Sequence, residues 1–184
     1  MNDKAIDKAV QALRNGGVIA YPTESVYGLG CDPDNIESIK RLLALKQRPH
    51  DKGMILLASD FAQLVPYLVD IDERLREPVM ASWPGPVTWL WPAKSDVSRW
   101  LRGQHDTLAV RVSAHPVAAK LCEKFSGALI STSANRSNET PARTAKEVHA
   151  LFPDLDYVLD AEVGGMDNPS EIRDILSGKI IRHA

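Results

Sequence analysis

The sequence has few cysteines, no long apolar run and little net charge, and each absence narrows the class of protein. Cys31 and Cys122 are its two cysteines among 184 residues. Two are too few for a disulfide framework, so we expect both to be small core residues in a reducing cytoplasm. No apolar stretch is long enough to span a membrane, and the first ten residues lack a signal-peptide pattern. The net charge of −2 does not by itself indicate nucleic-acid binding.

Several familiar catalytic motifs are also missing. The sequence contains no GxxxxGK[ST] phosphate loop, and Pro33 stands where a dinucleotide-binding motif starting at Gly28 needs its third glycine. There is no HExxH, no histidine pair at ligand spacing and no carboxylate cluster, so no built-in metal is predicted. A GxSxG elbow is absent, as is a plausible Ser-His-Asp set. The sequence therefore predicts neither a resident metal nor a covalent mechanism.

The apolar pattern alternates between helical and strand periodicity along the chain. A capping box of Asp34 and Glu37 is expected to open the second helix. Together the segments predict an α/β fold, one domain over residues 1–184, with a twisted, open mixed sheet flanked by helices. Expected helices cover residues 6–13, 36–45, 61–68, 73–81, 116–124 and 144–151, and expected strands cover 18–21, 54–57, 87–91, 108–112, 129–131, 157–159, 172–175 and 179–181.

Two polar segments stand where apolar runs stop. KQRP at residues 46–49 follows the helical run 36–45, and STSAN at residues 131–135 follows a strand-like run. Arginine grips an oxyanion with a planar fork, lysine supplies a point charge, and serine and asparagine donate neutral hydrogen bonds. The two segments together predict a site for a small anionic ligand such as a nucleotide. The alternative for the first segment is a solvated helix end that interacts with the helix dipole.

Basic residues gather in two stretches, which is compatible with phosphate or RNA partners and equally with solvated faces. The first stretch contains Lys40, Arg41, Lys46, Arg48 and Lys52, and the second contains Lys94, Arg99, Arg102 and His105.

Five motifs occur in the order and spacing of the YrdC-like family, which the chain resembles over essentially its whole length. They are YPTESVYGLG at 21–30, KQRP at 46–49, WPGPVT at 83–88, AVRV at 109–112 and STSAN at 131–135. The resemblance is to the short bacterial form without a second domain. One departure is Asn138, where the family usually has glycine; asparagine tolerates a positive φ better than most residues.

The resemblance implies a fold and an activity. The fold is an open α/β sheet with a deep, positively charged concave cleft. The implied reaction joins L-threonine, bicarbonate or CO2 and ATP, with Mg2+ carried by the nucleotide, into threonylcarbamoyl-AMP and pyrophosphate. Transferase complex proteins of the family's pathway then move the threonylcarbamoyl group to an adenosine of tRNA.

The family's ligand positions carry over where residues match. The KxR pair, Lys46 and Arg48, is implied to hold the triphosphate and the carboxylates and is the predicted catalytic pair, because adenylation accumulates negative charge on phosphorus oxygens. Strand alternation gives residues 107, 109 and 111 one face, and likewise 131, 133 and 135. The implied threonine contacts are Thr23, Arg111, Ser131 and Ser170, and the implied ATP contacts are Lys46, His50, Thr107, Ser133, Asn135, Pro141 and Arg182.

Two other interpretations remain at this stage. A non-catalytic module could hold double-stranded RNA or tRNA on the same basic surface, but this leaves Thr23, Ser131, Ser133 and Asn135 without a role. A different carbamoyl- or nucleotidyl-transfer enzyme on the same scaffold is the other, since fold alone does not fix chemistry.

Overall fold

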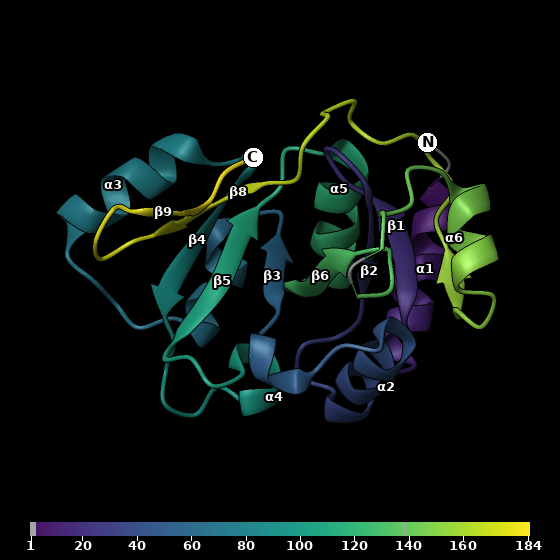
Figure 1. The fold of residues 1–184 in the computed structure, drawn as a ribbon, viewed down its shortest axis with the longest axis horizontal. Coiled ribbons are helices and arrows are strands. Elements are labelled where there is room, and N and C mark those ends of the chain that lie inside the picture. Colours follow the sequence, from purple (N-terminus) through teal and green to yellow (C-terminus); the bar gives the residue numbers. More distant parts are fainter. Residues whose placement is uncertain (1–2, 138) are drawn as a thin grey trace.

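The computed structural model describes residues 3–137 and 139–184, and a nine-stranded mixed sheet forms its centre (Figure 1). Asn138 lies outside the described residues. The strand order is β7-β1-β2-β6-β3-β5-β4-β8-β9, with parallel and antiparallel neighbours. The predicted α/β fold with an open mixed sheet is confirmed. The strands are β1 Ile19–Pro22, β2 Tyr27–Gly30, β3 Ile55–Ala58, β4 Val87–Pro92, β5 Thr107–Val112, β6 Leu129–Ser133, β7 Tyr157–Val158, β8 Glu171–Asp174 and β9 Ile180–Arg182.

Helices pack on both faces of this sheet. Figure 1 shows α1 and α5 gathered near β1 and β6, while β8 and β9 form the other edge. In the described part of the chain, no helix is both long and apolar enough to cross a membrane. The α-helices are α1 Asp3–Arg14, α2 Ile36–Lys46, α3 Glu73–Ser82, α4 Arg99–Arg102, α5 Pro116–Phe125 and α6 Ala145–Leu151, and the 3-10 helices are η1 His50–Lys52, η2 Phe61–Gln63 and η3 Val65–Tyr67.

Two apolar cores hold the helices in place, one on each face of the sheet. On one face, Leu13 of α1 and Leu121 of α5 pack with Leu57 of β3. The neighbouring residue Leu56 belongs to the core on the opposite face, together with Leu42 of α2. Successive strand residues point to opposite faces, so a single short strand contributes to both cores.

Both cysteines are fully buried and unpaired. Cys31 lies in the core on the α2 face and Cys122 in the core on the α1 and α5 face. Burial raises the pKa of each thiol to about 12. A thiol with so high a pKa carries little of the reactive thiolate. The prediction that both cysteines fill the core is confirmed.

Strand β5 shows how the sheet presents polar groups to a cavity. Leu108, Val110 and Val112 belong to the core on the α2 face. Thr107, Ala109 and Arg111 alternate with them and line the cavity on the other face, beyond the part that α1 and α5 cover. The predicted shared face of residues 107, 109 and 111 is confirmed.

Three sequence predictions about secondary structure are wrong. The first concerns the start of α2, whose N-cap is Asn35 rather than Asp34. The Asn35 side chain accepts a hydrogen bond from the Ser38 N–H at 3.1 Å. The Asp34 carboxylate instead accepts one from the Tyr67 hydroxyl at 3.1 Å. The helix begins at Ile36, as its apolar run predicts, so Asn35 and not Asp34 occupies the position from which a side chain reaches the third helical N–H.

The second and third errors concern residues 61–68 and 27–30. The expected helix over 61–68 is two separate 3-10 turns, with Pro66 in the second, because proline cannot donate the hydrogen bond that would continue a helix. Strand β2 was not predicted. Its glycines Gly28 and Gly30 show no alternation of apolar side chains in the sequence. The structure leaves no room for a side chain at Gly30, because a Cβ there would lie 2.4 Å from the Ile130 carbonyl oxygen.

Candidate active site

A cavity of about 390 Å³ lies on the sheet face that α1 and α5 leave partly uncovered. Strands β3, β4, β5, β6, β8 and β9 contribute to its wall, together with the β1–β2 turn and the segments that follow α2 and α4. No aspartate or glutamate is part of this lining, whereas several arginine, lysine and hydroxyl side chains are. The cavity is therefore built for an anionic ligand.

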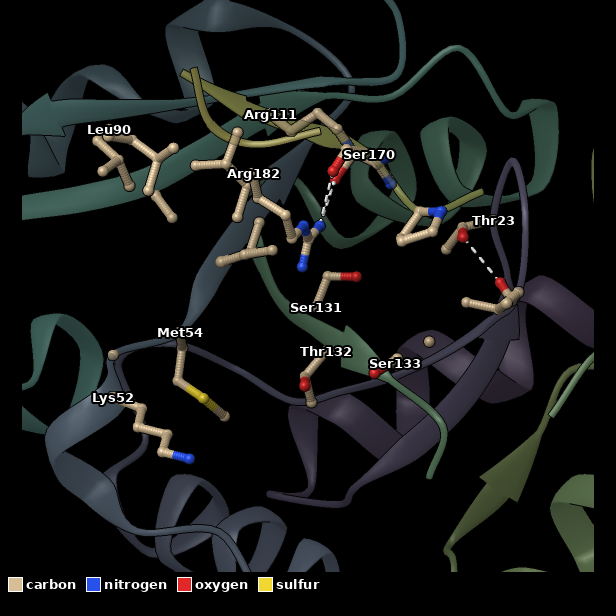
Figure 2. A pocket seen from close by; sticks show the side chains of 18 of the residues that line it. Thr23, Lys52, Met54, Leu90, Arg111, Ser131, Thr132, Ser133, Ser170 and Arg182 are labelled. Atoms are coloured by element: carbon tan, nitrogen blue, oxygen red, sulfur yellow. Dashed lines mark hydrogen bonds between the residues drawn. The ribbon is translucent and has the colours of Figure 1, made fainter. Parts of the chain in front are cut away.

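One part of the cavity, which we call the polar end, contains Thr23, Arg111, Ser131, Ser170 and Arg182. Figure 2 shows these five side chains on the side of the cavity opposite Lys52. The Thr23 hydroxyl donates to the Val26 carbonyl at 2.7 Å, so it also stabilises the β1–β2 turn. Two of the five residues come from the C-terminal part of the chain and complete the wall from the far edge of the sheet.

The C-terminal part of the polar end is held by hydrogen bonds. Arg182 Nη2 donates to the Ser170 carbonyl at 2.7 Å, and the Ser170 hydroxyl lies 2.9 Å from the Thr88 hydroxyl. Partial desolvation, and then the positive charge of Arg111, lower the pKa of Arg182. Two guanidinium groups thus approach the same part of the cavity, which favours an anion between them.

The other part, the basic end, contains Arg48, Lys52, Arg102 and His105. Arg48 Nη2 donates to the Gly53 carbonyl at 3.0 Å, and desolvation lowers its pKa. Arg102 donates to the His105 carbonyl at 2.7 Å and forms an ion pair with Asp106 at 3.4 Å. The Met54 N–H donates to the Leu101 carbonyl, which brings the segments after α2 and α4 together.

Lys46, predicted as one of two catalytic residues, is not part of the cavity wall. It is 2% exposed, and its ammonium donates to the carbonyl oxygens of Ser133 and Asn135. Burial, and then the charge of Arg48, lower its pKa to about 8. The two carbonyl dipoles act in the opposite direction, because they favour the charged form. Lys46 thus connects the end of α2 to the end of β6, next to the hydroxyl of Ser133.

Three predicted ATP contacts also lie outside the cavity wall. The Asn135 amide donates to the Glu139 carbonyl at 2.9 Å, and its oxygen accepts from the Ser133 hydroxyl at 2.6 Å. Strand β6 ends at Ser133, so the predicted alternation does not continue to Asn135. His50 packs against Trp100 with ring centroids 5.3 Å apart. Pro141 follows the same loop, just before Ala142, whose N–H donates to the Ala134 carbonyl.

The structure brings the remaining predicted residues together, although they come from six separate segments of the chain. The predicted residues that line the cavity are Thr23, Arg48, Thr107, Arg111, Ser131, Ser133, Ser170 and Arg182.

Sequence reasoning assigned no role in the site to four residues that lie in or beside it. Lys52, Arg102 and His105 line the basic end. All three belong to the basic stretches visible in the sequence, so the signal existed, but spacing alone did not separate them from solvated lysines and arginines. The fourth is Glu24, whose carboxylate lies 3.0 Å from Arg111. A single glutamate in a turn gives no sign of such a partner.

Comparisons with known proteins agree with this architecture. Residues 11–184 match the family of Sua5, YciO and YrdC proteins, described as "Telomere recombination". The threonylcarbamoyl-AMP synthase of Klebsiella pneumoniae is 51% identical over 181 residues, covering 97% of this chain and 95% of that protein. The enzyme of the same name from Serratia proteamaculans is 54% identical over 175 residues, covering 94% and 93%.

Solved structures show the same fold. P. abyssi Sua5 complexed with L-threonine has a TM-score of 0.89 and 31% identity, covering 95% of this chain and 52% of that one. The chain thus spans about half the length of that Sua5 protein. E. coli YciO has a TM-score of 0.82 and 25% identity, covering 94% and 84%. The family match includes nearly all of the chain, and the chain therefore belongs to the Sua5, YciO and YrdC family.

Proposed function

We propose that the protein is a threonylcarbamoyl-AMP synthase, a nucleotidyltransferase that joins L-threonine, bicarbonate or CO2 and ATP and releases pyrophosphate. The observation that carries the proposal is one cavity, without lining carboxylates, that has two arginines and three hydroxyls at its polar end and four basic residues at its basic end. The names of the similar bacterial proteins, and the L-threonine in the P. abyssi Sua5 structure, support the same reaction.

Threonine is proposed to bind at the polar end. Arg111 pairs with its carboxylate, since a guanidinium is the side chain best suited to two carboxylate oxygens. Thr23, Ser131 and Ser170 surround the amino acid with neutral hydroxyls, which suit its own hydroxyl and amine. All four side chains line the same part of the cavity.

ATP is proposed to extend from the polar end to the basic end. Arg48 binds the phosphates as a planar fork, and Lys52, Arg102 and His105 surround them with further positive or hydrogen-bonding groups. Thr107, Ser133 and Arg182 complete the nucleotide contacts. Lys46, Asn135 and Pro141 support this arrangement from behind, by holding the segment that follows β6.

The reaction then needs positioning rather than a protein nucleophile. The amine of threonine attacks CO2 with loss of a proton, or bicarbonate with loss of water, and forms a carbamate. A carbamate oxygen then attacks the α-phosphorus of ATP, and the bond to the leaving pyrophosphate breaks. Arg111 and Arg48 hold the reacting anions side by side against their mutual repulsion. Arranging reactants in this way lowers the activation free energy by up to roughly 7–11 kcal/mol. Positive charge at the basic end stabilises the transition state and the leaving pyrophosphate.

The residues present do not form a dedicated magnesium site. Magnesium prefers carboxylate oxygens, and the cavity wall contains none. Among the described residues there is also no group of three or more His, Cys, Asp or Glu side chains that could hold a metal ion. We propose that Mg2+ arrives on the phosphates of ATP, and no step depends on a protein ligand to it.

The product is proposed to serve tRNA modification in the cytoplasm. Threonylcarbamoyl-AMP is a reactive mixed anhydride, so proteins of a threonylcarbamoyl-transferase complex must accept it and transfer its acyl group to an adenosine of tRNA. The two unpaired cysteines suit a reducing compartment.

A double-stranded RNA or tRNA-binding module is the second candidate, and the exposed Lys52 and His105 favour it. The polar end argues against this role. Thr23, Arg111 and Ser131 are each less than 10% exposed, which suits a small ligand and not a duplex. RNA affinity without enzymatic function would fall steeply with salt and would not respond to threonine.

Pyrophosphate release from ATP tests the proposal, with threonine and bicarbonate omitted in turn. We expect release only when both are present. Release of orthophosphate, or turnover that does not need threonine, would refute it. RNA binding in the absence of any pyrophosphate release would favour the module instead.

A further inference from the structure

The β1–β2 turn contains a buried carboxylate next to the cavity that the proposed reaction does not use. Glu24 is 7% exposed, although it stands between Thr23 and Ser25, which both line the cavity. Its own side chain is not part of the wall. A buried carboxylate is costly unless it is paired and hydrogen-bonded, so the partners of Glu24 indicate what it does.

Glu24 is fixed by two donors and one cation. Its Oε1 accepts hydrogen bonds from the Ser113 hydroxyl at 2.9 Å and from the Ala114 N–H at 3.0 Å. Its Oε2 lies 3.0 Å from Arg111 Nη2. Oε2 is buried and accepts no hydrogen bond from the described residues, so its contact with Arg111 is one of charge. The backbone carbonyl of Glu24 also accepts from the Met166 N–H at 3.0 Å.

Glu24 holds the guanidinium of Arg111 from one side. Its side chain is 9% exposed, and within residues 3–137 and 139–184 its guanidinium has no ion-pair partner other than Glu24. The cavity side of the group thus keeps donors for a ligand. Glu24 fixes the direction of the fork without occupying the ligand's place.

The charges of this cluster also match one ligand. Partial desolvation, and then the like charge of Arg111, lower the pKa of Arg182, and both side chains line the cavity. The charge of Glu24 offsets that of Arg111, while Arg182 is left for the nucleotide. Without Glu24, Arg111 would add its full positive charge to that of Arg182, and the pair would attract a dianion such as a phosphate. Glu24 therefore lowers the attraction of Arg111 for phosphate relative to carboxylate.

We propose that Glu24 is a positioning residue that aims Arg111 at the carboxylate of the amino-acid substrate and thereby directs the amino acid, and not a phosphate of ATP, to Arg111. The inference rests on the proposed function, because it takes threonine as the ligand of Arg111.

The test compares Glu24→Gln with the wild-type protein by calorimetry. Glutamine keeps the size of the side chain and an acceptor for Ser113 and Ala114, but removes the charge that faces Arg111. We expect the Kd for L-threonine to rise about tenfold, while that for ATP stays within about twofold. The Kd for L-threonine methyl ester, which has no carboxylate, should also stay within about twofold. A purely structural defect would not separate the acid from its ester.

Asp156→Asn is the matched control. Asp156 is a carboxylate that pairs with Arg41 at 2.6 Å and accepts from the Val18 N–H, and it does not line the cavity. Loss of its charge should leave the affinities for threonine and ATP within about twofold, whatever it does to stability. Thermal unfolding verifies that both variants are folded. If Glu24→Gln does not fold, Glu24→Asp takes its place, because it keeps the charge but withdraws it from Arg111, and the same selective loss is expected.

The outcomes separate the inference from the function on which it rests. Absence of threonine binding by the wild-type protein would refute the proposed function. Wild-type binding of threonine, with no change in Glu24→Gln or with equal losses for threonine, its ester and ATP, would overturn the positioning role alone.

Discussion

The two ends of the cavity differ in how firmly their side chains are held. At the polar end, Thr23, Arg111 and Ser131 are buried, and Arg111 is paired with Glu24. At the basic end, Lys52 and His105 are exposed, and the buried Nε of Arg48 has no hydrogen-bond partner among the described residues. A pre-formed pocket selects a small ligand of one shape, since little ordering is needed on binding. Exposed basic side chains such as those of Lys52 and His105 suit a polyphosphate, whose charge is spread over many oxygens. The difference teaches that one cavity can divide selectivity and charge neutralisation between its two ends.

The largest effect is expected from Arg111→Ala, which removes the charge of the polar end. The affinity for threonine should fall by about 2–5 kcal/mol, because its carboxylate loses the charged partner. The affinity for ATP should change much less. Calorimetry with each ligand checks this, and a larger loss for ATP than for threonine would place Arg111 on the nucleotide and remove the distinction between the ends.

Arg48→Lys tests the basic end with its charge retained. Arg48 precedes Pro49, so its backbone is restricted to extended conformations. A planar fork grips two oxygens where an ammonium grips one, so kcat/KM for ATP should fall by roughly tenfold or more. Steady-state pyrophosphate release measures this. Arg99→Lys, which does not line the cavity, is the control and should stay within about twofold. Wild-type rates for Arg48→Lys would show that Arg48 is only a solvated residue at a helix end and does not grip the phosphates.

Lys46 offers a third test, because it lies outside the cavity wall and holds the end of β6. Lys46→Ala should abolish most activity by releasing the segment after β6, while Lys46→Arg should retain some. The loss of activity in Lys46→Ala should be accompanied by a lower Tm, since two buried carbonyls lose their donor. No such fall in Tm is expected for Arg48→Lys. Differential scanning calorimetry measures the change in Tm, and the pyrophosphate assay measures the change in activity. An inactive Lys46→Ala protein with an unchanged Tm would indicate direct contact with the phosphates.

The pH dependence of stability gives a further view of Lys46. Its pKa is lowered in the folded protein to about 8, below the value for an unfolded lysine. Between these values the unfolded chain binds the extra proton, so the free energy of unfolding should rise with pH from about 8 towards the unfolded pKa. Lys46→Met should lack this rise. Urea unfolding of both proteins across this range measures the difference, and parallel curves would mean that the two carbonyls keep the ammonium fully charged.

The smallest effect is expected from His50→Ala. His50 is exposed and packs on Trp100 outside the cavity wall. The KM for ATP should therefore change by less than about twofold. A larger rise in KM would indicate that His50 contacts ATP and belongs to the basic end.

Much of this arrangement could be predicted from the sequence, and the exceptions have physical causes. Strand β5, which contains Arg111, shows a clear alternation, so its cavity face was predicted correctly. Strand β2 was missed because Gly28 and Gly30 have no side chains to reveal a pattern. Asn135 was placed on the wrong face because alternation was extended past the end of β6.

Charged side chains were the least predictable part. The motif that contains Lys46 and Arg48 predicts both residues at one site, and the structure has Arg48 in the cavity wall and Lys46 outside it. It did not show that one side chain turns inward to backbone carbonyls while the other lines the cavity. Glu24 was missed for the same reason. Its partner Arg111 is 87 residues away in the sequence, so only the folded sheet brings the two charges together.

The division of the cavity is tested most directly by a crystal structure of the protein with L-threonine and a non-hydrolysable ATP analogue. We predict the threonine carboxylate on Arg111 at the polar end and the phosphates beside Arg48 and Lys52 at the basic end. Phosphate oxygens on Arg111, or threonine among the residues of the basic end, would contradict it.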